Sequence, residues 1–184
     1  MNKILWSVLL GGALVVVGCG GGMEETASNE TSPAESAELP PKPTALPVVP
    51  TTLPQQEWLK SDDPHLAMMK QKAYDLFRII IRARHVEEAS EYMAEDYIQH
   101  NPNANTGRAG FVAFFQSMGP PLEIRDTLPD LVAIQAEGDY VTLSFVREYD
   151  DPQRPGEKYT TTWFDMLRMG DDGLFVEHWD SATK

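Results

Sequence analysis

Three side chains near the C-terminus have the types and spacing that acid–base chemistry requires. Asp165 lies in the middle of one apolar run, and His178 and Asp180 lie two residues apart in the next. If all three face one apolar interior, two carboxylates and an imidazole converge where burial is costly unless the groups pair or serve chemistry. The alternative interpretation is a polar strand end that is exposed to water.

The elements that carry these side chains are predicted to be two strands of a hairpin. The segment Gly170-Asp-Asp-Gly173 joins them and is rich in residues that tolerate positive φ. Alternation along each strand predicts one shared inner face, with Trp163, Asp165 and Leu167 on the first strand and Val176, His178 and Asp180 on the second. Phe175 and Trp179 would lie on the opposite face, and an apolar outer face predicts coverage by a second subunit in a homodimer.

Each candidate residue has a catalytic and a structural interpretation. His178 and Asp180 could act as a base and the group that orients it, or as a pair that stabilises the domain end. Asp165 could donate to a ligand if it points inward and is an ordinary surface residue if it points outward. His100 could act as an acid, base or donor, or its ring could bond nearby loop backbone. We expect no metal site, because no H-x-x-H or H-E-x-x-H spacing occurs.

The N-terminus predicts export and a lipid anchor. Residues 1–18 combine the basic Lys3 with an apolar stretch too short to span a bilayer, and Gly18-Cys19 follows. Val16-Val17-Gly18-Cys19 resembles a bacterial lipoprotein signal with Cys19, the only cysteine, as the lipidated residue. A plain signal peptide or short anchor is the alternative. The predicted location is the cell envelope, at the outer membrane facing the periplasm if the host is Gram-negative.

Composition divides the rest of the chain into a tether and one domain. Residues 19–55 are rich in Pro, Glu, Ser and Thr, which predicts a disordered spacer. Residues 56–184 have the size of one domain with one core. Removal of residues 1–18 leaves 14 basic against 28 acidic residues, a net charge of −14. This charge argues against nucleic acid as a partner and against docking of the domain surface on anionic lipid.

The order of predicted elements is helices first and strands afterwards. A helix should run from Asp63-Pro64 to about Ala83, and a second is expected over about 86–95. A third carries Phe111, Phe114, Phe115 and Met118 on one face and stops at Gly119-Pro-Pro121. Strands are expected at about 122–136, 140–149, 158–169 and 174–180. Three helices followed by antiparallel strands predict an α+β fold.

Several segments resemble the SnoaL-like group of the nuclear transport factor 2-like superfamily. They are Tyr97-Ile-Gln-His-Asn-Pro102, Gly107-Arg-Ala-Gly-Phe111, Gly138-Asp-Tyr-Val141 and Gly173-Leu-Phe-Val-Glu-His-Trp-Asp180. The resemblance implies a curved antiparallel sheet that wraps a long helix into a cone, with a pocket at the open end and no cofactor. The expected ligand is a small apolar or carbonyl-bearing molecule.

The same resemblance implies roles for particular residues. Asp180 matches the acid/base carboxylate of the cyclases, Trp163 matches a pocket tryptophan, and His100 or Asn101 matches a polar residue after the second helix. The cyclases also place a histidine near Asp165-Met166, and its absence here puts a cyclase reaction in doubt.

Ketosteroid isomerases of the same superfamily offer a second comparison. Asp165 lies where their neutral acid donates to the substrate oxyanion. Their base position is Asn101 here and their donor tyrosine is Phe77, so isomerase action by that mechanism is not expected. Tyr74 could replace the donor if it faces the pocket. Phe115 and Leu167 complete the expected ligand-binding residues.

Two classes of function follow, and the sequence favours the first. One is a ligand-binding domain without turnover, because an acidic envelope lipoprotein has no obvious access to polyketide-like intermediates. The other is a cofactor-free lyase, isomerase or cyclase. Convergence of His178, Asp180 and either His100 or Asp165 on one cavity would favour the enzyme. Separated or outward-facing groups would favour binding alone.

Overall fold

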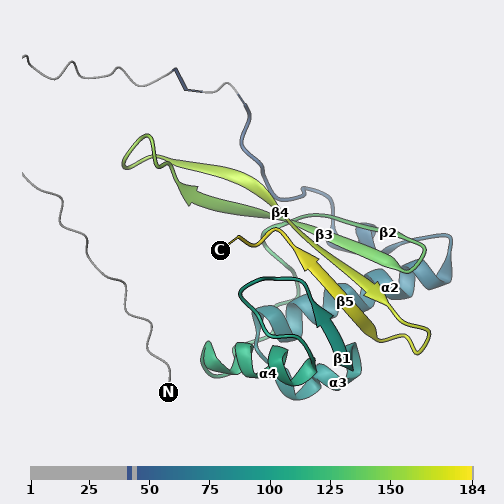
Figure 1. Ribbon diagram of the computed structural model, residues 1–184. Helices are drawn as coiled ribbons and strands as arrows, with labels where there is room; N and C mark the ends of the chain where they lie inside the picture. The colour runs from purple at the N-terminus through teal and green to yellow at the C-terminus, as the bar shows by residue number, and fades with distance from the viewer. Residues whose placement is uncertain (1–40, 43–44, 184) are drawn as a thin grey trace, which may run out of the picture. The chain divides into compact units, whose positions relative to one another are not determined.

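The computed structural model describes residues 41–42 and 45–183 (Figure 1). The predicted signal at residues 1–18, the lipidation site Cys19 and most of the predicted tether lie outside the described residues. Within the described part of the chain, no helix is both long and apolar enough to cross a bilayer.

A five-stranded curved sheet forms the centre of the domain, and helices cover it, which confirms the predicted α+β fold (Figure 1). Its strands are β1 (Met93–Gln99), β2 (Leu131–Glu137), β3 (Tyr140–Asp150), β4 (Lys158–Met169) and β5 (Phe175–Asp180). They are arranged in the order β1-β5-β4-β3-β2. The β1–β5 pair is parallel and the other pairs are antiparallel.

One long helical segment packs on the sheet, as the apolar spacing predicts. It consists of α2 (Pro64–Asp75) followed directly by the π-helix η1 (Leu76–Arg82). The Asp63 side chain caps its start by accepting a hydrogen bond from the backbone N–H of His65 at 2.8 Å. Near its end the Ala83 N–H donates to the Arg78 carbonyl, five residues back. A short helix, α1 (Gln55–Leu59), precedes it.

The predicted second helix is wrong over its last three residues, 93–95. The chain forms only a 3₁₀ turn, η2 (Val86–Glu88), and a short helix, α3 (Ala89–Tyr92), before strand β1 begins at Met93. The parallel ladder with β5 decides this, because it satisfies backbone groups that the sequence pattern alone assigned to a helix. The third predicted helix is present as α4 (Arg108–Ser117).

The first predicted strand is also too long, since only residues 131–137 belong to the sheet. Residues 122–130 run as an irregular segment that side chains hold in place. Tyr74 Oη donates to the Asp126 carbonyl at 3.1 Å, and Gln55 Nε2 donates to the Leu128 carbonyl at 2.6 Å. These bonds replace a strand ladder, and Pro129 could not donate to one.

The folded unit begins before the expected boundary at residue 56. The Thr51 N–H donates to the Leu131 carbonyl at 2.8 Å, and the Trp58 indole donates to the Thr51 hydroxyl at 3.0 Å. Residues 51–55 are therefore attached to the edge of the sheet rather than forming part of a free tether.

A bulge in β5 changes the alternation predicted for the last hairpin. Met169 pairs with Phe175 and Arg168 pairs with Glu177, so β5 holds one extra residue between these pairs. Phe175 therefore joins the core, where it is fully buried, on the same side as His178. The expectation that Phe175 lies on the outer face is wrong for this reason. Trp179 does lie on the outer face, and coverage of that face by a second subunit stays a prediction.

Candidate functional site

A cavity of about 280 Å³ lies between the helices and the inner face of the sheet. Its apolar lining comes largely from two helical elements, with Phe77 and Ile81 on η1 and Phe111, Phe114, Phe115 and Met118 on α4 and at its end. Trp163 contributes from β4. The volume is close to the lower end of the range for small-molecule sites. Asn101 and the three acid–base candidates line the same cavity: Asp165, His178 and Asp180.

Asp165 and His178 form a buried pair in the wall of this cavity. His178 Nε2 lies 3.0 Å from Asp165 Oδ1, and the two residues are only 5% and 6% exposed, respectively. The strand register produces the contact, because His178 faces Leu167 and Asp165 faces Asp180 across the β4–β5 ladder. Diagonal neighbours on one face of an antiparallel pair are within reach of an imidazole.

Gln99 holds the other side of the imidazole. Gln99 and His178 are partners in the parallel β1–β5 ladder, and Gln99 Nε2 donates to His178 Nδ1 at 3.0 Å. Nδ1 therefore accepts a hydrogen bond while Nε2–H donates to Asp165, which is the arrangement of a neutral imidazole. The tautomer and the ring orientation are both fixed.

The hydrogen bonds continue from Gln99 to Asp180. Gln99 Oε1 accepts from the backbone N–H of Asn101 at 3.0 Å, and Asn101 Nδ2 donates to Asp180 Oδ2 at 2.8 Å. Asp180 Oδ1 accepts from the Ala182 N–H at 2.9 Å. Both oxygens of Asp180 are thus engaged. Among the described residues no group bonds Asp165 Oδ2, so this oxygen is available to a ligand in the cavity.

Tyr97 packs against the imidazole of His178. Its ring lies 6.4 Å from the His178 ring between centroids, and the residue is only 1% exposed. Burial raises the pKa of the Tyr97 hydroxyl far above its ordinary value, with smaller contributions from the charges of Asp165 and Asp180. The phenol therefore stays neutral and packs beneath the imidazole without adding charge.

Two arginines that are not among the predicted site residues also line the cavity. Arg147 lies on β3 with its guanidinium 5.2 Å from the centre of the Trp163 ring, and Arg82 ends η1. A signal for Arg147 was present, since it continues the inward alternation of Leu143 and Phe145. Arg82 had no such signal. An α-helix would place Ile81, four positions after Phe77, on the same face, and the wider π-turn also brings Arg82, five positions after Phe77, to the cavity.

Three predicted site residues lie outside the cavity lining. His100 lies on the outer side of the sheet, where its Nε2 bonds Glu177 Oε1 at 2.8 Å and its ring stacks on Trp179. Tyr74 Oη bonds Gln55 Oε1 at 2.6 Å. Leu167 is buried in the core and pairs with His178 in the β4–β5 ladder. Phe77, Phe115, Trp163 and Asn101 do line the cavity.

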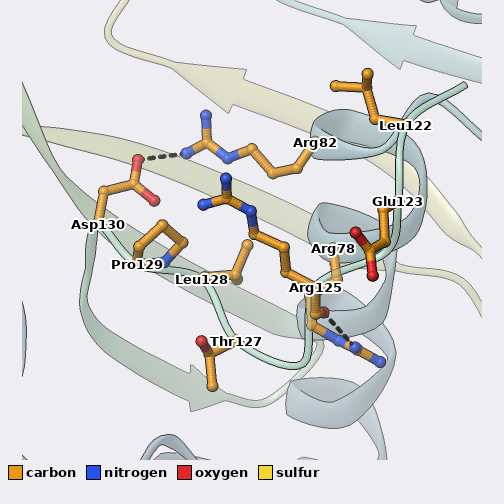
Figure 2. A pocket seen from close by; sticks show the side chains of 9 residues that line it. All are labelled: Arg78, Arg82, Leu122, Glu123, Arg125, Thr127, Leu128, Pro129 and Asp130. Carbon is orange, nitrogen blue, oxygen red and sulfur yellow. Dashed lines mark hydrogen bonds and ion pairs between the residues drawn. The ribbon is translucent and has the colours of Figure 1, made fainter. Parts of the chain in front are cut away.

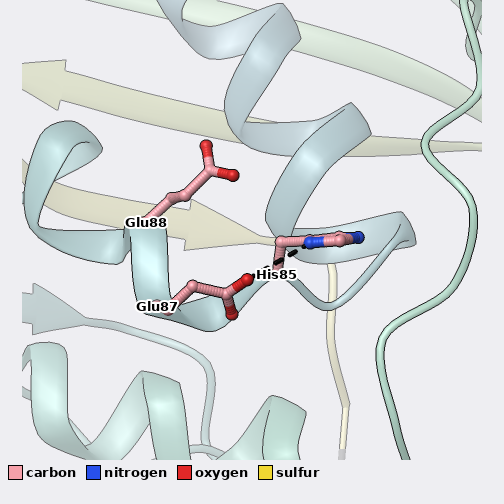
Figure 3. A group of neighbouring side chains, drawn as sticks. All are labelled: His85, Glu87 and Glu88. Atoms are coloured by element: carbon pink, nitrogen blue, oxygen red, sulfur yellow. Dashed lines mark hydrogen bonds and ion pairs between the residues drawn. The ribbon is translucent and has the colours of Figure 1, made fainter.

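Metal-ligand geometry occurs at two places in the described residues. The ligand atoms of Asp165, His178 and Asp180 lie within 4.8 Å of one another, although Gln99 and Asp165 already bond both imidazole nitrogens. The second group is His85, Glu87 and Glu88 at the surface (Figure 3). There His85 Nδ1 pairs with Glu87 at 3.2 Å and Nε2 lies 2.9 Å from the Leu122 carbonyl, so its nitrogens are also engaged.

A larger hollow of about 600 Å³ lies beside the irregular segment before β2 (Figure 2). Three arginines line it, from η1 and from that segment: Arg78, Arg82 and Arg125. Arg82 pairs with Asp130 at 2.6 Å, and Arg78 pairs with Asp75 at 2.9 Å. This hollow lacks the buried carboxylate–imidazole pair that lines the smaller cavity.

A comparison with protein-family models identifies the family of this domain. A scan of protein families matches residues 73–178 to the SnoaL-like domain. A search of curated proteins found no match. Among solved structures, a candidate SnoaL-like polyketide cyclase from Jannaschia sp. CCS1 is 19% identical with a TM-score of 0.45, covering 66% of this chain and 91% of that chain.

Two further solved structures are similar at the same low level of identity. IdmH, a candidate polyketide cyclase from Streptomyces antibioticus, is 22% identical with a TM-score of 0.39, over 61% of this chain and 87% of that one. AclR, a candidate hydroxylase from Streptomyces galilaeus, is 22% identical with a TM-score of 0.38, over 63% and 90%. The family match spans more than half of the sequence and includes β4 with Asp165 and the part of β5 that ends at His178. The chain therefore belongs to the SnoaL-like domain family.

Proposed function

We propose that this protein is a cofactor-free acid–base enzyme acting on a small, largely apolar molecule that carries a carbonyl group. The observation that supports it is the Asp165–His178 pair, almost fully buried in the wall of an aromatic-lined cavity. A buried carboxylate with one oxygen fixed and the other open to a cavity is suited to proton transfer. The sequence favoured binding alone, and the convergence of Asp165, His178 and Asp180 on one cavity reverses that preference.

The proposed step begins with proton transfer to Asp165. Asp165 Oδ2 takes a proton from the carbon next to the ligand carbonyl, so a C–H bond breaks and an O–H bond forms. The electron pair moves onto the carbonyl oxygen as an enolate. Arg82 lines the cavity, and those of its guanidinium donors that do not pair with Asp130 favour this developing negative charge. Asp165 then returns the proton to carbon or to oxygen, and His178 keeps the carboxylate oriented throughout.

A direct test is proton exchange in D₂O. Wild type is incubated with a panel of small aryl and alkyl ketones, and deuterium uptake next to the carbonyl is followed by NMR. Asp165→Asn keeps the size and an acceptor for His178 but removes the base, and general-base catalysis contributes about 10²–10⁴-fold. Asp171→Asn is the matched control, because Asp171 is exposed in the β4–β5 turn. Exchange that is absent in wild type, or unchanged in Asp165→Asn, would remove the proposal.

A second candidate function is ligand binding without turnover. The observation that favours it is that every polar atom of Asp180 and of the His178 ring is already engaged within the protein. Such a network also stabilises a rigid pocket. Ligand binding to the cavity without any proton exchange would identify this function.

The location is a separate proposal that rests on the N-terminal sequence. We propose that Cys19 is lipidated after removal of residues 1–18 and anchors the protein in the bacterial envelope. The support is the Val16-Val17-Gly18-Cys19 segment with its preceding apolar stretch. Replacing Cys19 with Ala should abolish incorporation of labelled fatty acid and move the protein out of the membrane fraction. Unchanged fractionation and labelling in this variant would exclude the anchor.

A further inference from the structure

The cavity is lined by one positively charged group that makes no ion pair with a carboxylate in the described part of the chain. Arg147 is half-buried on the inner face of β3, and its guanidinium lies 5.2 Å from the centre of the Trp163 ring. Among the described residues, Arg147 has no ion pair and donates no hydrogen bond. A half-buried guanidinium normally finds an acceptor, because its five donors lose water on burial.

The other charged groups of the cavity already have hydrogen-bond partners within the protein. Arg82 Nη2 pairs with Asp130 Oδ2 at 2.6 Å, Asp165 bonds His178, and Asp180 accepts from Asn101 and from backbone. Burial lowers the pKa of Arg82, and the neighbouring positive charge of Arg147 acts in the same direction, against the opposite effect of Asp130. The two guanidinium groups are therefore close enough to interact. An anionic group of a ligand that lies near both would be stabilised by their positive charges.

The position of Arg147 gives the direction in which a ligand would lie. Its cross-strand partner is Thr161, which precedes Asp165 by four residues on β4, and Trp163 lies between. Four residues of strand span about 13 Å at Cα. A ligand could bind with its anionic end at Arg147 and its apolar body against Trp163. The end of the ligand farthest from Arg147 would then lie near Asp165 Oδ2.

From this arrangement we infer that the ligand is a small oxo acid, an apolar molecule with a carbonyl group and one carboxylate that binds the Arg147 guanidinium. The inference rests on the proposed function, and it adds the class of substrate and a specificity-determining residue. A carboxylate matches the planar fork of an arginine with two parallel hydrogen bonds. A multiply charged anion fits less well, because the chain carries a net charge of −13 and the cavity contains two further carboxylates.

The test compares acids with neutral partners of the same shape. Benzoylpropionate and its amide form one pair, and two pairs with alkyl groups in place of phenyl extend the size range. Dissociation constants for the full chain are measured by calorimetry, with the quenching of tryptophan fluorescence as a second readout. A charged hydrogen-bonding partner corresponds to about a ten- to hundredfold preference for the acid.

Three variants assign that preference to one residue. Arg147→Gln should lower the affinity for the acid until it equals the affinity for the amide. The affinity for the amide should not change. Arg147→Lys keeps the charge without the fork and should retain a smaller preference. Arg125→Gln is the matched control, because it removes the same charge from an exposed arginine that donates no hydrogen bond among the described residues. It should leave the preference intact.

The outcomes separate this inference from the proposed function. Equal affinity for acid and amide in wild type, or binding of neither member of any pair, overturns the oxo-acid assignment. A preference that survives in Arg147→Gln, or disappears in Arg125→Gln, overturns the role of Arg147. Proton exchange that depends on Asp165 without acid preference leaves the proposed function standing. A binding preference for the acid without proton exchange would support the anion site and contradict the proposed catalytic step.

Discussion

Removal of one member of the Asp165–His178 pair should cost far more stability than removal of both. His178→Phe leaves the Asp165 carboxylate 6% exposed without the partner that now lies 3.0 Å away. A buried charged group that loses its hydrogen-bond partner destabilises a protein by about 1–3 kcal/mol or more. The whole domain is expected to have a free energy of unfolding of about 5–15 kcal/mol, so the loss is a large fraction.

The double variant Asp165→Leu/His178→Phe should recover most of that loss. Apolar residues of similar size remove the need to desolvate either group, and such replacements are often neutral or stabilising. Urea unfolding of wild type, both single variants and the double variant gives the coupling energy between the two sites. We expect a coupling of at least about 2 kcal/mol. The double variant should also lose any proton-exchange activity while keeping its stability.

The result that would refute this reasoning is additivity. If the two single losses sum to the loss in the double variant within about 0.5 kcal/mol, the pair is not coupled. A His178→Phe variant as stable as wild type would show that the Asp165 carboxylate reaches water. Either result removes the physical basis of the site. The control is Asp171→Asn, whose exposed side chain should leave the unfolding curve unchanged.

Three further predictions concern the residues around the site. Gln99→Leu should destabilise the protein by about 1–3 kcal/mol in urea unfolding, because it leaves the buried His178 Nδ1 without a donor; a loss below about 0.5 kcal/mol would contradict the assigned contact. A hydrogen bond from His100 and, to a smaller extent, one from Arg168 lower the pKa of Glu177 below its ordinary value of 4.5. The stability that these bonds contribute is therefore present above pH 4.5 and is lost as the pH falls through the folded-state pKa. The melting temperature of Glu177→Gln should accordingly lie below that of wild type at pH 7 and approach it in acid, whereas a constant difference would exclude the linkage. Tyr74→Phe should lower stability by about 1 kcal/mol without changing ligand affinity, since its hydroxyl bonds Gln55 and the segment before β2; reduced affinity would place Tyr74 at the site.

The sequence predicted the fold because its patterns are local and regular. The Asp63-Pro64 cap and the apolar spacing that follows predict the long helix, and the alternation in residues 140–149 and 158–169 predicts the central hairpin. The lining by Phe115 and Trp163 follows from the same periods of 3.6 and 2. These features depend on neighbouring residues only, so no tertiary information was needed.

Tertiary structure alone decided which polar groups meet. Gln99 reaches His178 only because β1 pairs in parallel with the distant β5, and that ladder also ends the helix predicted over 86–95. Arg82 enters the cavity through a π-turn, and Phe175 turns inward at a bulge, both of which break the regular periods that the sequence displays. Pairing across long sequence separations and single-residue insertions leave no local pattern, so only the folded chain shows them.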